Sequence, residues 1–232
     1  MKYVSIDLET TGLETENHQI LSIGAVIEDT LDTRINVEDL PTFHGVIVHN
    51  ELTGSPFALN MNRDLIEKIS VWQNTKEENK GEFENLTGMS FFNEDQIVKG
   101  LFQFLYRNGI RPDYKEVGEH LKGMVEKGKD GVTYPCLSSN MPKVHLTAAG
   151  KNFATFDLKF LERLPRWKQV FRVRQRIIDP SVIFTNWKED ESLPGLSLCK
   201  TRANMDGHVA HDAVEDARDI IRLLRTQYAF PV

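Results

Sequence analysis

The chain lacks the features that mark secreted and membrane proteins. Its 232 residues include only two cysteines, Cys136 and Cys199, which lie far apart and form no Cys-x-x-Cys pair. This pattern argues against a disulfide framework and against a cysteine zinc site. No apolar run approaches the roughly 18 residues of a membrane span, and no signal-peptide pattern precedes the first predicted strand. We therefore expect a soluble, cytoplasmic protein.

Positive charge is also scarce, since 28 Lys and Arg face 34 Asp and Glu, for a formal net charge of -6. This balance argues against a protein that holds long duplexes by neutralising many phosphates, because that mode needs a basic face. It does not exclude nucleic acid, because cations bound to clustered carboxylates become the largest local charges. No Gly-x-Gly-x-x-Gly follows the first strand, so a dinucleotide-binding oxidoreductase loses its main support.

Hydrophobic periodicity predicts a mixed α/β fold. Alternation predicts strands at residues 3–9, 19–28 and 43–49, which form an antiparallel meander. Helical spacing and end signals predict helices at 62–69, 93–107, 155–163 and 212–228, with further strands at 144–149 and 174–178. Residues 73–85 are predicted to be an exposed loop, and residues 111–142 a surface insertion with an amphipathic segment. This order predicts one α/β domain over residues 1–232, with helices flanking a mixed sheet.

The first strand carries two acids at an unexpected place. In the stretch VSIDLETTGL, the aliphatic side chains alternate onto one face, and Asp7 and Glu9 share the other. An edge strand with a solvated face would explain both acids. However, the aliphatic face is typical of a strand packed by helices, and the small-residue turn that follows would let a ligand approach the backbone. The pair is a candidate site that needs support from other residues.

Further acids lie at the starts of two predicted helices. Asp157 follows a Gly-Lys-Asn turn, and the helix dipole alone would explain it. Asp212 and Glu215 have the spacing of a capping box. Asp216 lies one helical turn after Asp212, and capping does not explain an acid at that position. His211 immediately precedes this helix and either belongs to the loop or faces a cleft.

The joint pattern resembles the DEDD exonucleases, in their histidine-containing branch. The segments SIDLETTGL, NFATFDLKFL and HDAVEDA are similar to the family's three motifs and occur in the same order. The resemblance implies a ribonuclease H-like fold and a 3′-to-5′ exonuclease that releases nucleoside 5′-monophosphates from single-stranded DNA or RNA. It implies two Mg²⁺ or Mn²⁺ ions and the general base His211. The implied metal ligands are Asp7, Glu9, Asp157 and Asp216.

The resemblance also suggests substrate contacts and partners. Relatives place backbone amides and an apolar wedge after the first motif, and an aromatic ring in the second turn could stack on a base. The expected contacts are Thr10, Thr11, Gly12, Leu13, Asn152 and Phe153. A homodimer and a polymerase are the alternative protein partners. The rival function is a binding module that keeps the fold without catalysis, and the presence of all five catalytic groups counts against it.

Overall fold

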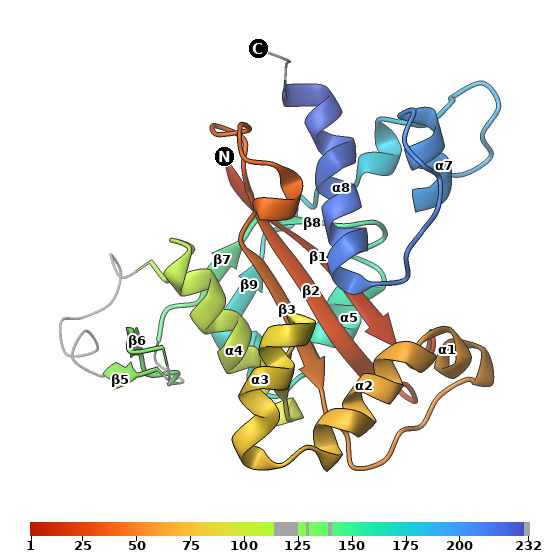
Figure 1. Cartoon of the computed structure of the whole chain (residues 1–232). Coiled ribbons are helices and arrows are strands. Elements are labelled where there is room, and N and C mark those ends of the chain that lie inside the picture. Colours follow the sequence, from red (N-terminus) through yellow and green to blue (C-terminus); the bar gives the residue numbers. More distant parts are fainter. Residues whose placement is uncertain (114–124, 129, 139–140, 230–232) are drawn as a thin grey trace.

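The computed structural model describes residues 1–113, 125–128, 130–138 and 141–229, which are built around a central five-stranded sheet (Figure 1). Its strand order is β4-β3-β2-β1-β8. The long strands β1 and β2 pair antiparallel, as do β2 and β3, which confirms the predicted meander. The edge strand β4 runs parallel to β3, and β8 runs parallel to β1. The bounds are β1 Lys2–Thr10, β2 Ile20–Asp29, β3 Thr42–Ile47, β4 Ser90–Phe92 and β8 Ala148–Ala149.

A second ladder is two-stranded and parallel, and its first strand directly precedes β8 in the chain. It consists of β7 (Val144–Leu146) and β9 (Phe171–Val173), so the strand predicted at 144–149 is divided between β7 and β8. The prediction of a strand at 174–178 is wrong, because regular strand pairing ends after β9. Within that range, the N–H of Arg174 donates to Leu146, and only Ile178 forms a bridge, with Ala149.

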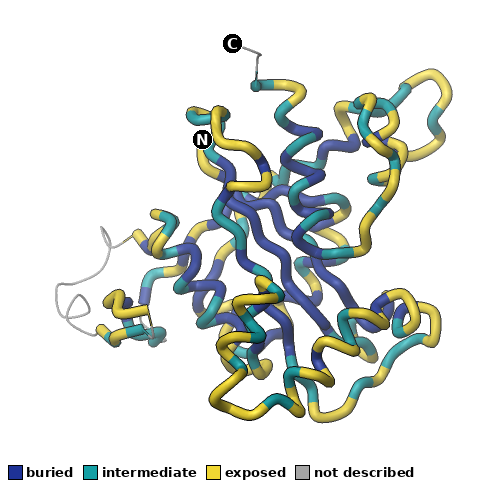
Figure 2. The backbone as a smooth tube through the Cα atoms, viewed as in Figure 1, coloured by how far each residue is buried: buried dark blue, intermediate teal, exposed yellow. Residues whose placement is uncertain are grey.

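Helices cover both faces of the sheet and form two hydrophobic cores. Helix α8 (Ala213–Tyr228) packs its apolar stripe on the face that carries Tyr3 and Val26. The opposite face, with the aliphatic side chains of β1, packs against α4 (Glu94–Arg107), α5 (Asp157–Leu161) and α6 (Trp167–Val170). The strands are accordingly buried along most of their length (Figure 2). Helix α7 (Leu196–Arg202) lies beside α8.

Three further helices lie around one end of the meander (Figure 1). They are α1 (Pro56–Met61), α2 (Arg63–Asn74) and α3 (Glu77–Thr87). The exposed loop predicted at 73–85 is therefore wrong, because most of it is α3. This helix has no fully buried residue, and Phe83 packs on Phe91 at 5.8 Å between ring centroids. Its surface is so polar that helical periodicity is not visible in the sequence.

The predicted insertion contains a hairpin that packs on α4. Strands β5 (Val125–Lys127) and β6 (Thr133–Pro135) pair antiparallel, and the buried Tyr134 ring lies 5.6 Å from that of Tyr106. An ion pair of 2.8 Å joins Lys99 to Glu126. The predicted amphipathic segment falls largely on residues 114–124, outside the described part of the chain. Two 3₁₀ turns complete the described elements, η1 (Val37–Asp39) and η4 (Pro180–Val182). Among the described residues, no helix combines the length and apolarity needed to cross a bilayer.

Candidate functional site

Three carboxylates converge at the end of β1. Asp7 and Glu9 project from the same face of this strand because side chains alternate with period two. Asp216, in the first turn of α8, faces them, and one oxygen from each of the three residues lies within 4.8 Å of the others. The cluster joins three of the four predicted carboxylates, from positions more than 200 residues apart in the chain.

Gly24 allows α8 to approach the sheet at this point. It lies opposite Asp7 in the β1–β2 ladder, and a Cβ there would be 2.2 Å from the backbone carbonyl of Ala213. Only a residue without a side chain lets the first helical turn come this close. Gly24 thus helps to place Asp216 against Asp7. Sequence reasoning missed it, although a glycine inside an apolar strand is a recognised sign of close backbone approach.

Asp157 is the first residue of α5, and its side chain is 3% exposed. It is not one of the three acids whose oxygens lie within 4.8 Å of one another. Its charge nevertheless acts on Asp7, whose pKa is raised well above the ordinary value by burial first and by the charges of Asp157 and Asp216 next. The structure thus brings Asp157 near the cluster, at its margin.

The cluster holds protons more tightly than isolated carboxylates do. Burial, followed by the charge of Asp216, raises the pKa of Glu9 to about 8. Burial raises the pKa of Asp157 to about 7, against a smaller lowering by backbone hydrogen bonds from its own residue and from Leu8. Burial and the charge of Asp219 raise the pKa of Asp216 to about 6. Carboxylates crowded in this way are stabilised either by protons or by cations.

The donor atoms fit a hard divalent cation. The Oδ1 atom of Asp216 is buried and has no hydrogen-bond partner among the described residues. A buried carboxylate oxygen without a partner is costly unless a proton or a cation meets it. Asp7, Glu9 and Asp216 supply only oxygen ligands, which are preferred by Mg²⁺, Mn²⁺ and Ca²⁺. The acidic cluster can therefore hold a metal ion.

His211 lies on the turn that leads into α8. It is exposed and has a left-handed backbone with φ of 51°, a conformation that costs energy for a non-glycine residue. It lines a cavity of about 210 Å³ together with His44, Asn62 and Asp212.

Asp212 accepts hydrogen bonds from the N–H groups of Val214 and Glu215 and so caps the helix, as predicted. The Glu215 carboxylate does not complete the capping box, because it binds arginines of α8 instead.

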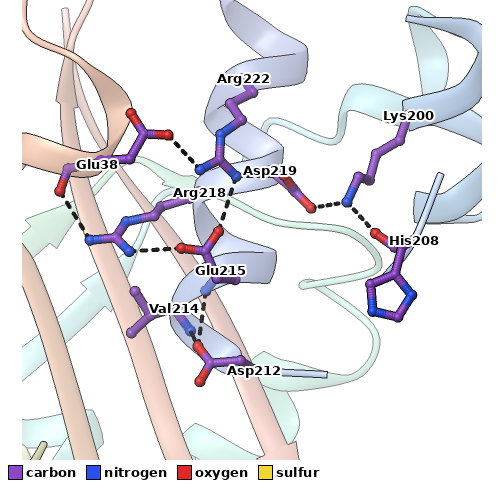
Figure 3. Close-up of polar contacts among 9 residues, drawn as sticks. All are labelled: Glu38, Lys200, His208, Asp212, Val214, Glu215, Arg218, Asp219 and Arg222. Carbon is purple, nitrogen blue, oxygen red and sulfur yellow. Dashed lines mark hydrogen bonds and ion pairs between the residues drawn. The ribbon is translucent and has the colours of Figure 1, made fainter. Parts of the chain in front are cut away.

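A network of charged side chains, with Lys200 and Asp219 buried at its centre, holds the turn before α8 (Figure 3). The Lys200 ammonium, on α7, donates to the backbone carbonyl of His208 and to the Asp219 carboxylate. Arg222 donates to the other oxygen of Asp219 at 2.6 Å and to Glu38 at 2.8 Å. The network thus joins α7, η1 and the turn to the helix that carries Asp216. No local pattern in the sequence indicates this arrangement, because its members come from three separate segments.

The turn after the first motif is largely buried. Thr11 is 0% exposed, its N–H donates to Gln19, and its hydroxyl accepts from the N–H of the same residue. The Thr10 hydroxyl donates to the carbonyl of Gly12, which is also buried. Only Leu13 projects outward, with 80% of its surface exposed. The prediction that the Thr11 side chain or amide contacts the substrate is therefore wrong, because both groups are buried and bonded to Gln19. Leu13 has the exposure expected of an apolar wedge.

The second motif differs from expectation at Phe153. Its ring is 1% exposed and belongs to the core under α4 and α5, so the prediction that it stacks on a base is wrong. Phe156, three residues further on, is only partly buried. Asn152 is exposed and takes a left-handed conformation with φ of 57°, which asparagine tolerates better than most residues. Its N–H donates to Asp179 at 3.0 Å.

Two residues of the α1 region were missed by sequence reasoning. The Asn62 amide is buried, donates to the carbonyl of Thr10 at 3.3 Å, and lowers the pKa of Glu9 by hydrogen bonding, against the larger effect of burial. Phe57 is 78% exposed on α1, whose N-cap Ser55 donates its N–H to the carbonyl of Thr11. An exposed aromatic ring on the helix that contacts the first-motif turn is a candidate stacking surface that no sequence pattern identified.

Comparison with known proteins gives a structural likeness only. No protein-family model matches the chain, and no curated protein matches it. The nuclease domain of 3′hExo, a DEDDh family member solved with rAMP, is 15% identical, with a TM-score of 0.53, over 99% of this chain and 94% of that one. E. coli exonuclease I with a dA16 oligonucleotide is 14% identical, with a TM-score of 0.52, and the match covers 98% of this chain but 41% of the exonuclease.

Cell-death related nuclease 4 (CRN-4) gives a similar result, with 11% identity and a TM-score of 0.52 over 97% of this chain and 62% of that nuclease. All three neighbours share the mixed sheet flanked by helices that the described residues form around β1. The chain has the ribonuclease H-like fold of the DEDDh nucleases.

Proposed function

We propose that the protein is a metal-dependent 3′-to-5′ exonuclease of the DEDDh type, which releases nucleoside 5′-monophosphates from single-stranded DNA or RNA. The observation that carries the proposal is the convergence of Asp7, Glu9 and Asp216 within 4.8 Å, on a fold shared with nucleases of that type. A fold alone does not specify an activity, so the argument depends on the site. A catalytically inactive binding module would not need the partly unpaired, proton-retaining carboxylates described above.

Asp7, Glu9, Asp157 and Asp216 are the proposed ligands of two Mg²⁺ or Mn²⁺ ions. Such ions, when bound, activate a water molecule and stabilise the leaving 3′-oxygen. The chain's own part is to hold the carboxylates on rigid elements, β1, α5 and α8. His211, exposed on the turn before α8, accepts the proton of the attacking water.

The proposed substrate is the 3′ end of a single strand. Leu13 and Phe57 are exposed on segments that contact each other beside the carboxylates, and aromatic faces bind bases with little sequence preference. Structures of the neighbours contain rAMP in 3′hExo and a deoxyadenosine oligonucleotide in exonuclease I, which supports a substrate of either sugar. The expected product is a nucleoside 5′-monophosphate.

The direct test uses single-stranded oligonucleotides labelled at the 5′ end, with Mg²⁺ or Mn²⁺. We expect a ladder of products shortened from the 3′ end, and no turnover with a metal chelator. Asp7→Asn should abolish hydrolysis, and His211→Ala should reduce kcat by about 10²-fold or more while the metal-induced shift in Tm remains. Asp32→Asn, which removes an exposed carboxylate paired with Arg34, is the matched control. Full activity of Asp7→Asn would refute the proposal.

A further inference from the structure

Basic side chains are concentrated in one part of this acidic chain. Residues 159–176 contain seven Lys and Arg and a single acid, Glu162, for a formal charge of +6. Because the whole chain carries -6, the remaining residues carry -12. A segregation of this size produces a local positive field that the net charge conceals.

Part of this segment forms an exposed surface at the β7–β9 ladder. His145 and Arg172 are opposite each other in the ladder, and Arg174 and Arg176 follow directly in the chain. All four are exposed and line one groove of about 660 Å³, which also includes Met1. We call these residues the basic edge: His145, Arg172, Arg174 and Arg176.

The arginines of the basic edge are not neutralised by acids in the described part of the chain. The ion pairs near them join Lys168 to Glu162 at 3.1 Å and Lys151 to Asp179 at 3.9 Å. Within the ranges that the structure describes, no ion pair includes Arg172, Arg174 or Arg176. Guanidinium groups present donors in a fixed fork that matches phosphate oxygens, so an unpaired set is suited to a polyanion.

The basic edge is separate from the carboxylate cluster. Met1 lies in the groove at the start of β1, whereas Asp7 lies further along the same strand, which corresponds to about 20 Å at the rise of an extended chain. A nucleotide bound at the carboxylates could not also contact the groove. About six steps of a helical nucleic acid would cover the same distance.

We propose that the basic edge binds backbone phosphates of the nucleic-acid substrate, away from the 3′ end that is hydrolysed. This inference rests on the proposed function for the identity of the polyanion. A second contact of this kind adds to the affinity for long substrates through effective concentration, and it gives nothing to substrates too short to reach it. It also explains how an acidic chain holds a polyanion, because the repulsive and attractive charges lie at opposite ends of β1.

The test compares Arg172→Gln/Arg174→Gln/Arg176→Gln with a control that loses the same charge from exposed sites elsewhere, Arg34→Gln/Lys76→Gln/Lys188→Gln. Binding of a fluorescent single strand of about 15 nucleotides, longer than the six-step span, is measured by anisotropy with Ca²⁺ at several salt concentrations. We expect the first variant to bind about ten-fold more weakly at low salt. Its slope of log affinity against log salt should fall by about 2, as expected for three lost phosphate contacts.

Turnover of a dinucleotide should be unchanged in the same variant. The proposal would be overturned if the variant bound the long strand as tightly as the wild type does. It would also be overturned if the variant's rate on the dinucleotide fell as much as its affinity for the long strand. Competition by poly-glutamate as strong as that by the oligonucleotide would overturn it too, and would point to an acidic protein partner instead. If the wild-type protein hydrolyses neither substrate, the exonuclease assignment fails, and the anisotropy measurement still decides whether the basic edge binds the strand.

Discussion

The ammonium group of Lys200 lies between the Asp219 carboxylate of α8 and the backbone carbonyl of His208. Lys200 is 7% exposed and Asp219 4%, so loss of the lysine leaves a buried carboxylate that, among the described residues, is neutralised only by Arg222. We expect Lys200→Met to lower the free energy of unfolding by about 3 kcal/mol. Denaturant titration measures this change, and Lys188→Met, at an exposed position, is the control.

The same substitution should reduce kcat, because His211 follows His208 by three residues on the turn that Lys200 fixes. The metal-induced increase in Tm should persist, since the hydrogen bonds of the Lys200 ammonium go to His208 and Asp219 and its charge acts on Asp216 only from a distance, lowering the pKa of that carboxyl. A variant as stable and as active as the wild type would contradict the role assigned to this ion pair.

The carboxylate cluster should make stability depend on pH in an unusual direction. The folded pKa values of Glu9, Asp157 and Asp216, about 8, 7 and 6, lie above those of unfolded carboxyls near 4. The native state therefore binds more protons than the unfolded state in this range, and the free energy of unfolding falls as pH rises from about 4 to 8. Without metal, we expect a loss of at least about 2 kcal/mol across that window.

Cations should reverse this loss, because they bind the same oxygens after the protons leave. The increase in Tm caused by Mn²⁺ should be larger near pH 8 than near pH 5. Asp7→Asn, which removes one charge from the cluster, should flatten both dependences. Equal metal shifts at the two pH values would show that these carboxylates are not the binding site.

Gly24 offers a test of how close α8 must lie to the sheet. The added Cβ of Gly24→Ala would meet the Ala213 backbone at 2.2 Å, and overpacking of this kind costs about 1–3 kcal/mol. Displacement of the first turn of α8 should also weaken Mn²⁺ binding through Asp216. Gly81→Ala is the matched control, because nothing lies within 4 Å of its Cβ on α3, where alanine should stabilise the helix by about 0.5–1 kcal/mol. Unchanged metal affinity in Gly24→Ala would separate the glycine from the site.

The parts of the fold that the sequence predicted are those with strong local patterns. Strict alternation identified β1, and helical spacing identified α8. Because both elements have a clear period, the positions of the acids at the end of β1 and at the start of α8 could be read from the sequence. α3 was missed because its contacts are few and its surface is polar. β9 was placed too late because alternating arginines after Val173 imitate a strand that the ladder does not continue.

The site was predicted less completely than the fold. Its carboxylates follow from motifs, but Asn62 and Lys200 act through contacts with segments far away in the chain, which no local pattern encodes. The net charge even pointed away from the basic edge, because acids elsewhere outweigh Arg172 and its neighbours. Close approach and local charge depend on tertiary structure, so they appear only once the elements are assembled.

The two phenylalanines near the site should respond to substitution in opposite ways. Phe153 is 1% exposed in the core, so Phe153→Ala should lower the free energy of unfolding by about 3–5 kcal/mol through the cavity it leaves. Phe57 is 78% exposed, so Phe57→Ala should leave stability nearly unchanged and raise KM for single strands, by the equivalent of about 1–3 kcal/mol for one lost base stack. Leu86→Ala, at a residue 79% exposed on α3, controls for removal of a surface apolar side chain. A KM effect in Phe153→Ala at full stability, with none in Phe57→Ala, would restore the stacking role to the second-motif turn.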